Sequence, residues 1–148
     1  MDYQILKTYE SKGLVRSQTH PTLPLTIWNY TEKVQYESLW DEVTTQCRGL
    51  ITNSKGEIVV RPFGKFFNYE EVIDKNLIPW DSEYVYIQDK MDGSLGILFF
   101  YDDEWIMATR GSFTSEQSIR GMEILKRNYP DFDKVWMKEY AYLVEIIY

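Results

Sequence analysis

Apolar and polar residues alternate along several short stretches of the chain, and residues that favour turns separate these stretches. Residues 25–30 and 142–148 are rich in aliphatic and aromatic side chains, which is typical of strands. Residues 43–50 lead into another strand, and Asn53-Ser54-Lys55-Gly56 is a strong turn signal before a return strand over residues 57–61. Pro62 then ends this pairing or lies at its edge, because proline cannot donate a ladder hydrogen bond. The pattern predicts a β-hairpin in the first half of the chain.

The second half of the chain combines strand and helix patterns. Residues 84–110 predict three strands, joined by turns at Asp92-Gly93-Ser94 and Asp102-Asp103-Glu104. Thr114 followed by Gln117 predicts a capping box for a helix that runs to about residue 127, and residues 133–139 predict a short second helix. Residues 1–24 show no clear period and are predicted to be irregular. Strands with a few helices on antiparallel pairs indicate an α+β fold.

Composition limits the size of this fold and the setting in which it works. A chain of 148 residues with 44% hydrophobic side chains can bury a substantial core, so we expect one domain over residues 1–148. Cys47 is the sole cysteine and His20 the sole histidine, so an internal disulfide is excluded and no zinc site is expected. A net charge of −7 makes any contact with nucleic acid local. Without a signal peptide or a long apolar span, we expect a soluble cytoplasmic protein with no membrane partner.

Lys90-Met91-Asp92-Gly93 places an amine beside a carboxylate and a tight glycine turn, an arrangement that suits attack on a nucleotide phosphate. Lysine attacks only as the free amine, whereas an ordinary lysine with a pKa of about 10.4 is almost wholly protonated at neutral pH. Partial burial, neighbouring cations or a metal must therefore favour the uncharged form. Alternation over residues 84–90 predicts a half-buried strand that leads into Lys90, and Gly93 would let the backbone approach a phosphate. The same residues also fit an ordinary hairpin with an Asp-Gly turn.

Other polar residues each allow a functional and a structural interpretation. Arg48 could hold a polyphosphate in bidentate fashion or form a surface ion pair. Lys65 could neutralise phosphate charge while Phe67 packs on or near a base, or it could lie over core aromatic rings. Asp92 could steer the neighbouring amine or help to order a metal. Glu145 lies between apolar residues of a predicted strand, where an unpaired charge costs free energy, and this cost suggests a functional role.

Several strings extend in order from residue 47 to the last residue, and the longer ones are more specific than the lysine motif. They are Cys47-Arg48-Gly49-Leu50, Arg61-Pro62-Phe63-Gly64-Lys65-Phe66-Phe67-Asn68, Lys90-Met91-Asp92-Gly93-Ser94-Leu95, Arg110-Gly111-Ser112-Phe113-Thr114-Ser115-Glu116-Gln117 and Leu143-Val144-Glu145-Ile146-Ile147-Tyr148. Taken in this order, they resemble one family, the RNA ligase 1 group of phage tRNA-repair ligases among the covalent nucleotidyltransferases.

The resemblance implies an antiparallel-sheet nucleotidyltransferase domain that uses ATP and Mg²⁺. It implies that Lys90 forms a lysyl-AMP intermediate and passes AMP to an RNA 5′-phosphate, which is then joined to a 3′-hydroxyl. In this family Arg110 matches a basic position at the nucleotide site, and Glu145 matches a residue that hydrogen-bonds a ribose hydroxyl. The residues that hold the metal are not identified by the sequence.

The chain departs from the family in one respect, because the downstream Glu-Gly and Lys-x-Lys motifs are not within it. We therefore expect a C-terminally incomplete domain that by itself is weakly active or inactive, with a downstream segment or subunit as a partner. Two alternatives remain open. The lysine motif alone also fits a capping-type guanylyltransferase, and the missing motifs fit a non-catalytic fragment that binds nucleotide or RNA.

Overall fold

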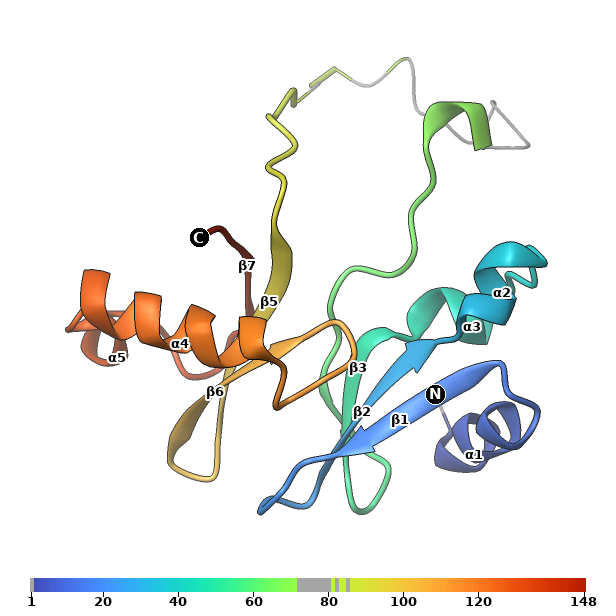
Figure 1. The fold of residues 1–148 in the computed structure, drawn as a ribbon, viewed down its shortest axis with the longest axis horizontal. Helices are drawn as coiled ribbons and strands as arrows, with labels where there is room; N and C mark the ends of the chain where they lie inside the picture. The colour runs from blue at the N-terminus through green and yellow to red at the C-terminus, as the bar shows by residue number, and fades with distance from the viewer. Residues whose placement is uncertain (1, 72–80, 82, 85) are drawn as a thin grey trace.

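The computed structural model describes residues 2–71, 81, 83, 84 and 86–148, and in them two antiparallel sheets carry helices on their outer sides (Figure 1). The strand order is β1-β2-β3-β4 in one sheet and β6-β5-β7 in the other. The α+β class with antiparallel sheets is thus confirmed, and the nucleotidyltransferase fold remains a prediction. The strands are β1 (Val15–Thr19), β2 (Leu25–Tyr30), β3 (Arg48–Asn53), β4 (Ile58–Val60), β5 (Ser94–Tyr101), β6 (Glu104–Thr109) and β7 (Tyr142–Ile146). The helices are α1 (Tyr3–Ser11), α2 (Glu32–Tyr36), α3 (Glu42–Gln46), η1 (Tyr69–Glu71), α4 (Glu116–Asn128) and α5 (Phe132–Val135).

The main core lies between the two sheets. Ile27 and Ile51 of the first sheet and Ile97 and Phe99 of the second are at most 2% exposed and form one apolar cluster. Burial of each such side chain contributes roughly 1.5–3 kcal/mol. Gly49 has a φ of +89°, and a Cβ at this position would lie 2.6 Å from Ile97 Cδ1. The absence of a side chain at Gly49 therefore lets the two sheets approach each other.

Each sheet also packs a helix on its outer face. Leu6 of α1 joins Val15 and Trp28 in one cluster, because alternate residues of a strand point to opposite faces. On the other sheet, α4 packs close to β7, where a Cβ at Gly121 would lie 2.7 Å from Ile146 Cδ1. None of the helices in the described part of the chain combines the length and the apolar character needed to cross a membrane.

Several predicted elements are confirmed. β2 covers residues 25–30 as predicted, and the turn before β4 is closed by a hydrogen bond of 3.0 Å from Gly56 N–H to the Asn53 carbonyl. α4 is present, but the capping box predicted at residues 114 and 117 is wrong by one position. Ser115 is the N-cap, and its Oγ accepts from Ser118 N–H at 3.1 Å. α5 is shorter than predicted and begins one residue earlier, and β7 ends at Ile146.

The prediction of irregular structure over residues 1–24 is wrong, because α1 and β1 lie there. The Asp2 carboxylate caps α1 by accepting from Gln4 N–H at 2.9 Å. Only Leu6 of this helix is buried, so the apolar stripe is too short to show a clear helical period. Before β3, residues 42–46 form α3, whose Asp41–Thr44 capping box is a signal that the sequence contains and the prediction missed.

The strand predicted to lead into Lys90 is also wrong. Residue 85 lies outside the described residues, and residues 84 and 86–90 have no strand conformation. Tyr86 and Ile87 are 85% and 94% exposed, so no face of this segment is buried. The reason is that β5 already pairs on both sides, with β6 and with β7, and begins only at Ser94. The alternating segment therefore has no free edge of β5 to pair with, and the described part of residues 84–110 contains two strands instead of three.

Candidate functional site

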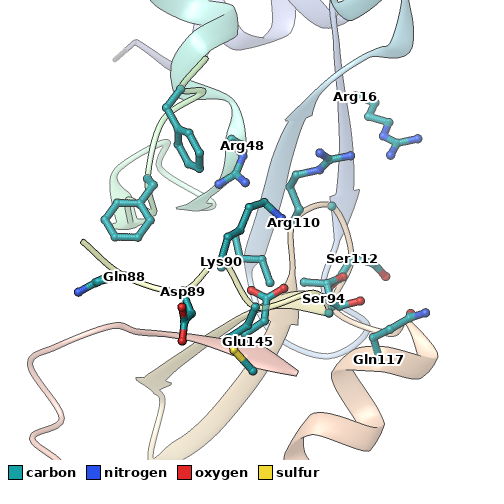
Figure 2. Close-up of a pocket in the computed structure, with 17 residues that line it drawn as sticks. Arg16, Arg48, Gln88, Asp89, Lys90, Ser94, Arg110, Ser112, Gln117 and Glu145 are labelled. Atoms are coloured by element: carbon teal, nitrogen blue, oxygen red, sulfur yellow. The ribbon is translucent and has the colours of Figure 1, made fainter. Parts of the chain in front are cut away.

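A pocket of about 830 Å³ lies where residues from both sheets meet the chain between β4 and β5 (Figure 2). β1 and β3 contribute from one sheet, and β5, β7 and the turn after β6 contribute from the other. The lining residues are Arg16, Arg48, Phe63, Phe66, Gln88, Asp89, Lys90, Met91, Gly93, Ser94, Leu95, Thr109, Arg110, Gly111, Ser112, Gln117 and Glu145.

Arg48 is directed into the pocket by an irregularity at the start of β3. In the register of β2 with β3, Trp28 faces Leu50 and Asn29 faces Arg48, so Gly49 is an extra residue between the two pairs. A glycine with positive φ is typical of such a bulge, which redirects the neighbouring side chain. The Arg48 guanidinium lies 5.1 Å from the centre of the Phe66 ring, a cation–π distance.

Arg110 is held by a tight turn directly after β6. Thr109 N–H donates to the Ser112 carbonyl at 2.8 Å, which closes the turn around Arg110 and Gly111. The Arg110 guanidinium lies 5.3 Å from the centre of the Tyr30 ring, and its Nη1 donates to the Tyr30 hydroxyl at 3.2 Å. Tyr30 therefore orients this guanidinium, a role that the sequence did not reveal.

Lys90 enters the pocket from an exposed segment without regular structure. Gly93 brings this segment against β7, because a Cβ at Gly93 would lie 2.5 Å from the Ile146 carbonyl oxygen. This close approach to another strand gives a structural reason for the glycine, beside the approach to a phosphate. Glu145 of β7 pairs in register with Leu95 and is exposed, so the free-energy cost that we expected for a charge in this strand does not arise.

The pocket is positively charged within an acidic chain. Its charged side chains are four cations, Arg16, Arg48, Lys90 and Arg110, and two anions, Asp89 and Glu145. Within the described residues, the ion pairs are confined to neighbours on helix surfaces such as Arg120 with Glu123. The pocket cations are thus available to an anionic ligand, and Figure 2 shows Arg48, Lys90 and Arg110 directed toward a common space.

Three of the sequence-predicted site residues do not line the pocket, namely Lys65, Phe67 and Asp92. Lys65 Nζ donates to the Phe66 carbonyl at 2.8 Å and lies 4.5 Å from the centre of the Phe67 ring. The Phe67 ring meets the Trp40 ring edge to face at 5.5 Å. Asp92 is exposed. The structure therefore brings together five of the predicted residues: Arg48, Lys90, Gly93, Arg110 and Glu145.

Sequence reasoning missed Arg16 and Trp40. Arg16 lies on β1, in the region predicted to be irregular, and only the alternation of residues 15–18 could have indicated its strand. Trp40 lies between two parts of the site, with its ring 4.9 Å from Tyr30 and 5.5 Å from Phe67. Neither residue belongs to a recognisable motif, so only the three-dimensional structure identifies them as site residues.

Asp89 and Glu145 are the carboxylates that line the pocket. In the part of the chain that the structure describes, no group of three or more His, Cys, Asp or Glu residues is arranged to hold a metal ion. Mg²⁺ at nucleotide sites is commonly bound by one or two carboxylates together with substrate phosphates and water. Two carboxylates beside four cations fit a metal that arrives with a polyphosphate.

Two comparisons with known proteins both point to RNA ligases. The model of a family described as RNA ligase matches residues 46–145. A protein of Autographa californica nuclear polyhedrosis virus, named "Putative bifunctional polynucleotide kinase/RNA ligase", is 37% identical over 107 residues, which cover 61% of this chain and 15% of that protein. The chain thus spans about 15% of the length of this curated relative.

Proposed function

Because the chain belongs to the phage RNA ligase 1 family, whose model matches residues 46–145, we propose that the pocket binds ATP and that Lys90 is the nucleophile of an RNA ligase. The resemblance found in the sequence is confirmed by this match. The observation that carries the proposal is the convergence of Arg48, Lys90 and Arg110 on one pocket in a chain of net charge −7. ATP brings about four negative charges, and preorganised cations stabilise such a ligand and the charge that develops as it reacts.

In the proposed first step, the uncharged Nζ of Lys90 attacks the α-phosphorus of ATP. A bond from nitrogen to phosphorus forms, the bond to the bridging oxygen breaks, pyrophosphate leaves in line, and the amine proton passes to solvent. Arg48 and Arg110 lie beside Lys90 and stabilise the negative charge on the phosphates. Mg²⁺, held with the phosphates near Asp89, would supply further charge neutralisation.

The neighbouring residues take supporting roles in this proposal. Phe63 and Phe66 present exposed rings to the pocket, and Phe67 lies behind them against Trp40. Lys65 reaches the phosphates only by leaving the Phe66 carbonyl and the Phe67 ring, so we expect it to move when ATP binds.

Glu145, on β7, accepts a hydrogen bond from a ribose hydroxyl of the nucleotide. Asp92 does not line the pocket, so it can steer the Lys90 amine only after a movement of the exposed segment, whose backbone Gly93 keeps close to β7.

In the second and third steps AMP passes to RNA and then leaves. An oxygen of the RNA 5′-phosphate attacks the phosphorus bound to Lys90, the nitrogen–phosphorus bond breaks, the Lys90 nitrogen takes up a proton from solvent, and an adenylylated RNA end results. A 3′-hydroxyl then attacks the RNA phosphate, AMP leaves, and the hydroxyl proton passes to solvent. The polyphosphate chemistry of the pocket supports only the nucleotide step, and the RNA steps follow from membership of the family.

The decisive experiment incubates the chain, alone and joined to a downstream segment that carries the Glu-Gly and Lys-x-Lys motifs, with radiolabelled ATP and Mg²⁺ and maps any adduct to a peptide. The expected adduct lies on Lys90, resists hydroxylamine and is labile to acid, as phosphoramidates are. Lys90→Ala and Lys90→Arg should both abolish it, because arginine supplies no uncharged amine at neutral pH. Lys55→Ala is the matched control, since Lys55 lies in the exposed turn before β4. An adduct on another residue, or one that persists in Lys90→Ala, would contradict the proposal.

Radiolabelled GTP separates this proposal from the two alternatives. We expect ATP to be preferred because the strings around Arg48, Lys65 and Arg110 resemble an ATP-dependent family. Equal or better labelling by GTP would instead favour a capping-type guanylyltransferase. ATP binding without any adduct, even with that downstream segment present, would favour a fragment that binds nucleotide but does not react with it.

A further inference from the structure

Arg16 is a pocket residue that lies outside the segment matched by the family model. It is on β1, where it pairs in register with Asn29 of β2. Val15 on one side of it is buried in the cluster beneath α1, and Ser17 on the other side donates to Glu10 of that helix. Because strand residues alternate, the Arg16 side chain points to the opposite face, toward the pocket.

The position of Arg16 is fixed by its neighbour on the same face. Gln18 Oε1 accepts a hydrogen bond of 2.7 Å from Phe113 N–H, which ties β1 to the chain just after the Arg110 turn. As a result, Arg16 Nη2 lies 3.7 Å from the position that a Cβ at Gly111 would occupy. The hydrogen bond of Gln18 is thus structural. It fixes β1 so that the Arg16 guanidinium lies over the backbone of Gly111, which has no side chain.

The Arg16 side chain itself has no such structural contact. It is exposed, and among the described residues it takes part in none of the side-chain hydrogen bonds, ion pairs or cation–π contacts. A guanidinium left unpaired beside a second guanidinium, that of Arg110, is repelled by it unless an anion lies between them. The arrangement therefore fits a ligand with a phosphate group, which two arginines can bind in bidentate fashion.

A phosphate at Arg16 would be distinct from those of a nucleotide at Lys90. In Figure 2 Arg110 lies between Arg16 and Lys90, so Arg16 is at the end of the pocket remote from Lys90 and from Arg48, whose guanidinium lies 5.1 Å from the centre of the Phe66 ring. Ser112 and Gln117 also line the pocket, near Ser94 in Figure 2, and add a hydroxyl and an amide. A volume of about 830 Å³ is near the top of the range of about 300–1,000 Å³ for small-ligand sites, which leaves room beyond one nucleotide.

We propose that Arg16 binds the 5′-terminal phosphate of the RNA strand that receives AMP. This inference rests on the proposed function, and it adds a specificity-determining residue for the second substrate from outside the family match. Arg110 then lies between the two phosphates that react, the RNA 5′-phosphate at Arg16 and the phosphate of AMP on Lys90. The 5′-phosphate end is thereby distinguished from a 5′-hydroxyl end.

The test measures binding of a short single-stranded RNA by fluorescence anisotropy, with either a 5′-phosphate or a 5′-hydroxyl. The wild-type chain should prefer the 5′-phosphate, and Arg16→Ala should weaken its binding about tenfold, as expected for one charge-assisted phosphate contact. Binding of the 5′-hydroxyl RNA should change less than about twofold. The slope of log affinity against log salt should fall by about 0.7.

Two further variants keep the result interpretable. Arg16→Lys retains a charge but not the planar fork, so we expect an intermediate loss of 5′-phosphate preference. Arg127→Ala removes the same charge from the exposed end of α4 and should leave the preference unchanged. Circular dichroism melting of each variant identifies any loss of fold, in which case Arg16→Lys provides the test.

Several outcomes would overturn the inference. They are equal loss for both RNA ends, a preference that survives in both Arg16 variants, a larger loss of ATP affinity than of RNA affinity, and absence of 5′-phosphate preference in the wild-type chain. None of these depends on lysyl-AMP formation. Failure of the proposed function would instead appear as the absence of a Lys90 adduct, whatever the result of the RNA measurements.

Discussion

Two kinds of backbone supply the charged residues of the pocket. Arg48, Arg110 and Glu145 come from strands or from a turn directly after one, and these strands are anchored by the buried cluster between the sheets. Lys90 comes from the connection between β4 and β5, whose green and yellow parts rise away from the sheets in Figure 1. The residues that bind charge are thus fixed, whereas the proposed nucleophile is on a segment with little burial.

The difference in burial between the strands and the connection allows one pocket to combine rigidly held cations with a movable nucleophile. Ile97, on β5, is fully buried, whereas Ile87, a few residues before Lys90, is 94% exposed. Preorganised cations need a rigid support, because a charged group that must be reoriented during the reaction stabilises less. A nucleophile that must pass AMP to a second substrate benefits from freedom to move. We therefore expect perturbations of the two regions to affect different properties of the protein.

The largest expected effect on stability is that of Ile97→Ala. Its side chain is fully buried between the sheets and reaches Gly49, so its removal should lower the free energy of unfolding by about 2–5 kcal/mol. Ile87→Ala, the matched change in the connection, should alter it by less than about 0.5 kcal/mol. Urea denaturation measures both. Comparable losses for the two variants would show that the connection is as firmly packed as the strands.

Arg110→Ala should weaken ATP binding by about tenfold to a hundredfold, because it removes a charged donor worth roughly 1.5–3 kcal/mol. Isothermal titration calorimetry with ATP and Mg²⁺ provides the measurement. Arg120→Ala removes the same charge from an exposed helical ion pair and serves as the control. If both variants bind ATP like the wild-type chain, the strand-anchored cations do not hold the nucleotide.

The connection should respond to ATP where Lys65 meets Trp40. Lys65 Nζ lies 5.5 Å from the centre of the Trp40 ring, and its departure toward the phosphates changes the surroundings of that indole. We expect ATP to change tryptophan fluorescence in the wild-type chain and in Trp136→Phe, but not in Trp40→Phe. Trp136 packs against Phe132 and Tyr142, away from the pocket, so it is the matched control. A change that persists in Trp40→Phe would contradict the proposed movement.

A smaller effect concerns pH and the strand-anchored region alone. Burial raises the pKa of the Cys47 thiol, directly before Arg48, to about 12. The unfolded thiol has a pKa of about 8.5, so its ionisation favours the unfolded chain, and this contribution to stability is complete below about pH 8.5 and is lost as pH rises above it. Cys47→Ala should flatten the decline in the free energy of unfolding between about pH 7.5 and about pH 9.5. An unchanged slope would show that the thiol is accessible.

The sequence predicts the strand-anchored region far better than the connection. β2, the turn before β4 and the body of α4 follow from local pattern, since their apolar faces meet the core directly. The segment before Lys90 alternates like a strand, but its structure depends on whether a neighbouring strand is free, and pairing of β5 with β7 is a long-range property. Arg16 could not be predicted as a pocket residue for the same reason, because its position depends on a long-range contact between Gln18 and Phe113.

The most direct test of the account is a crystal structure of the chain with Mg²⁺ and a non-hydrolysable ATP analogue. We expect the phosphates to lie between Arg48, Lys90 and Arg110, with the α-phosphorus within reach of Lys90 Nζ. A second cavity of about 340 Å³, lined by residues that include His20, Trp105 and Met122, offers a clear contrast. A nucleotide bound in that cavity, or one whose phosphates point away from Lys90, would contradict the central claim.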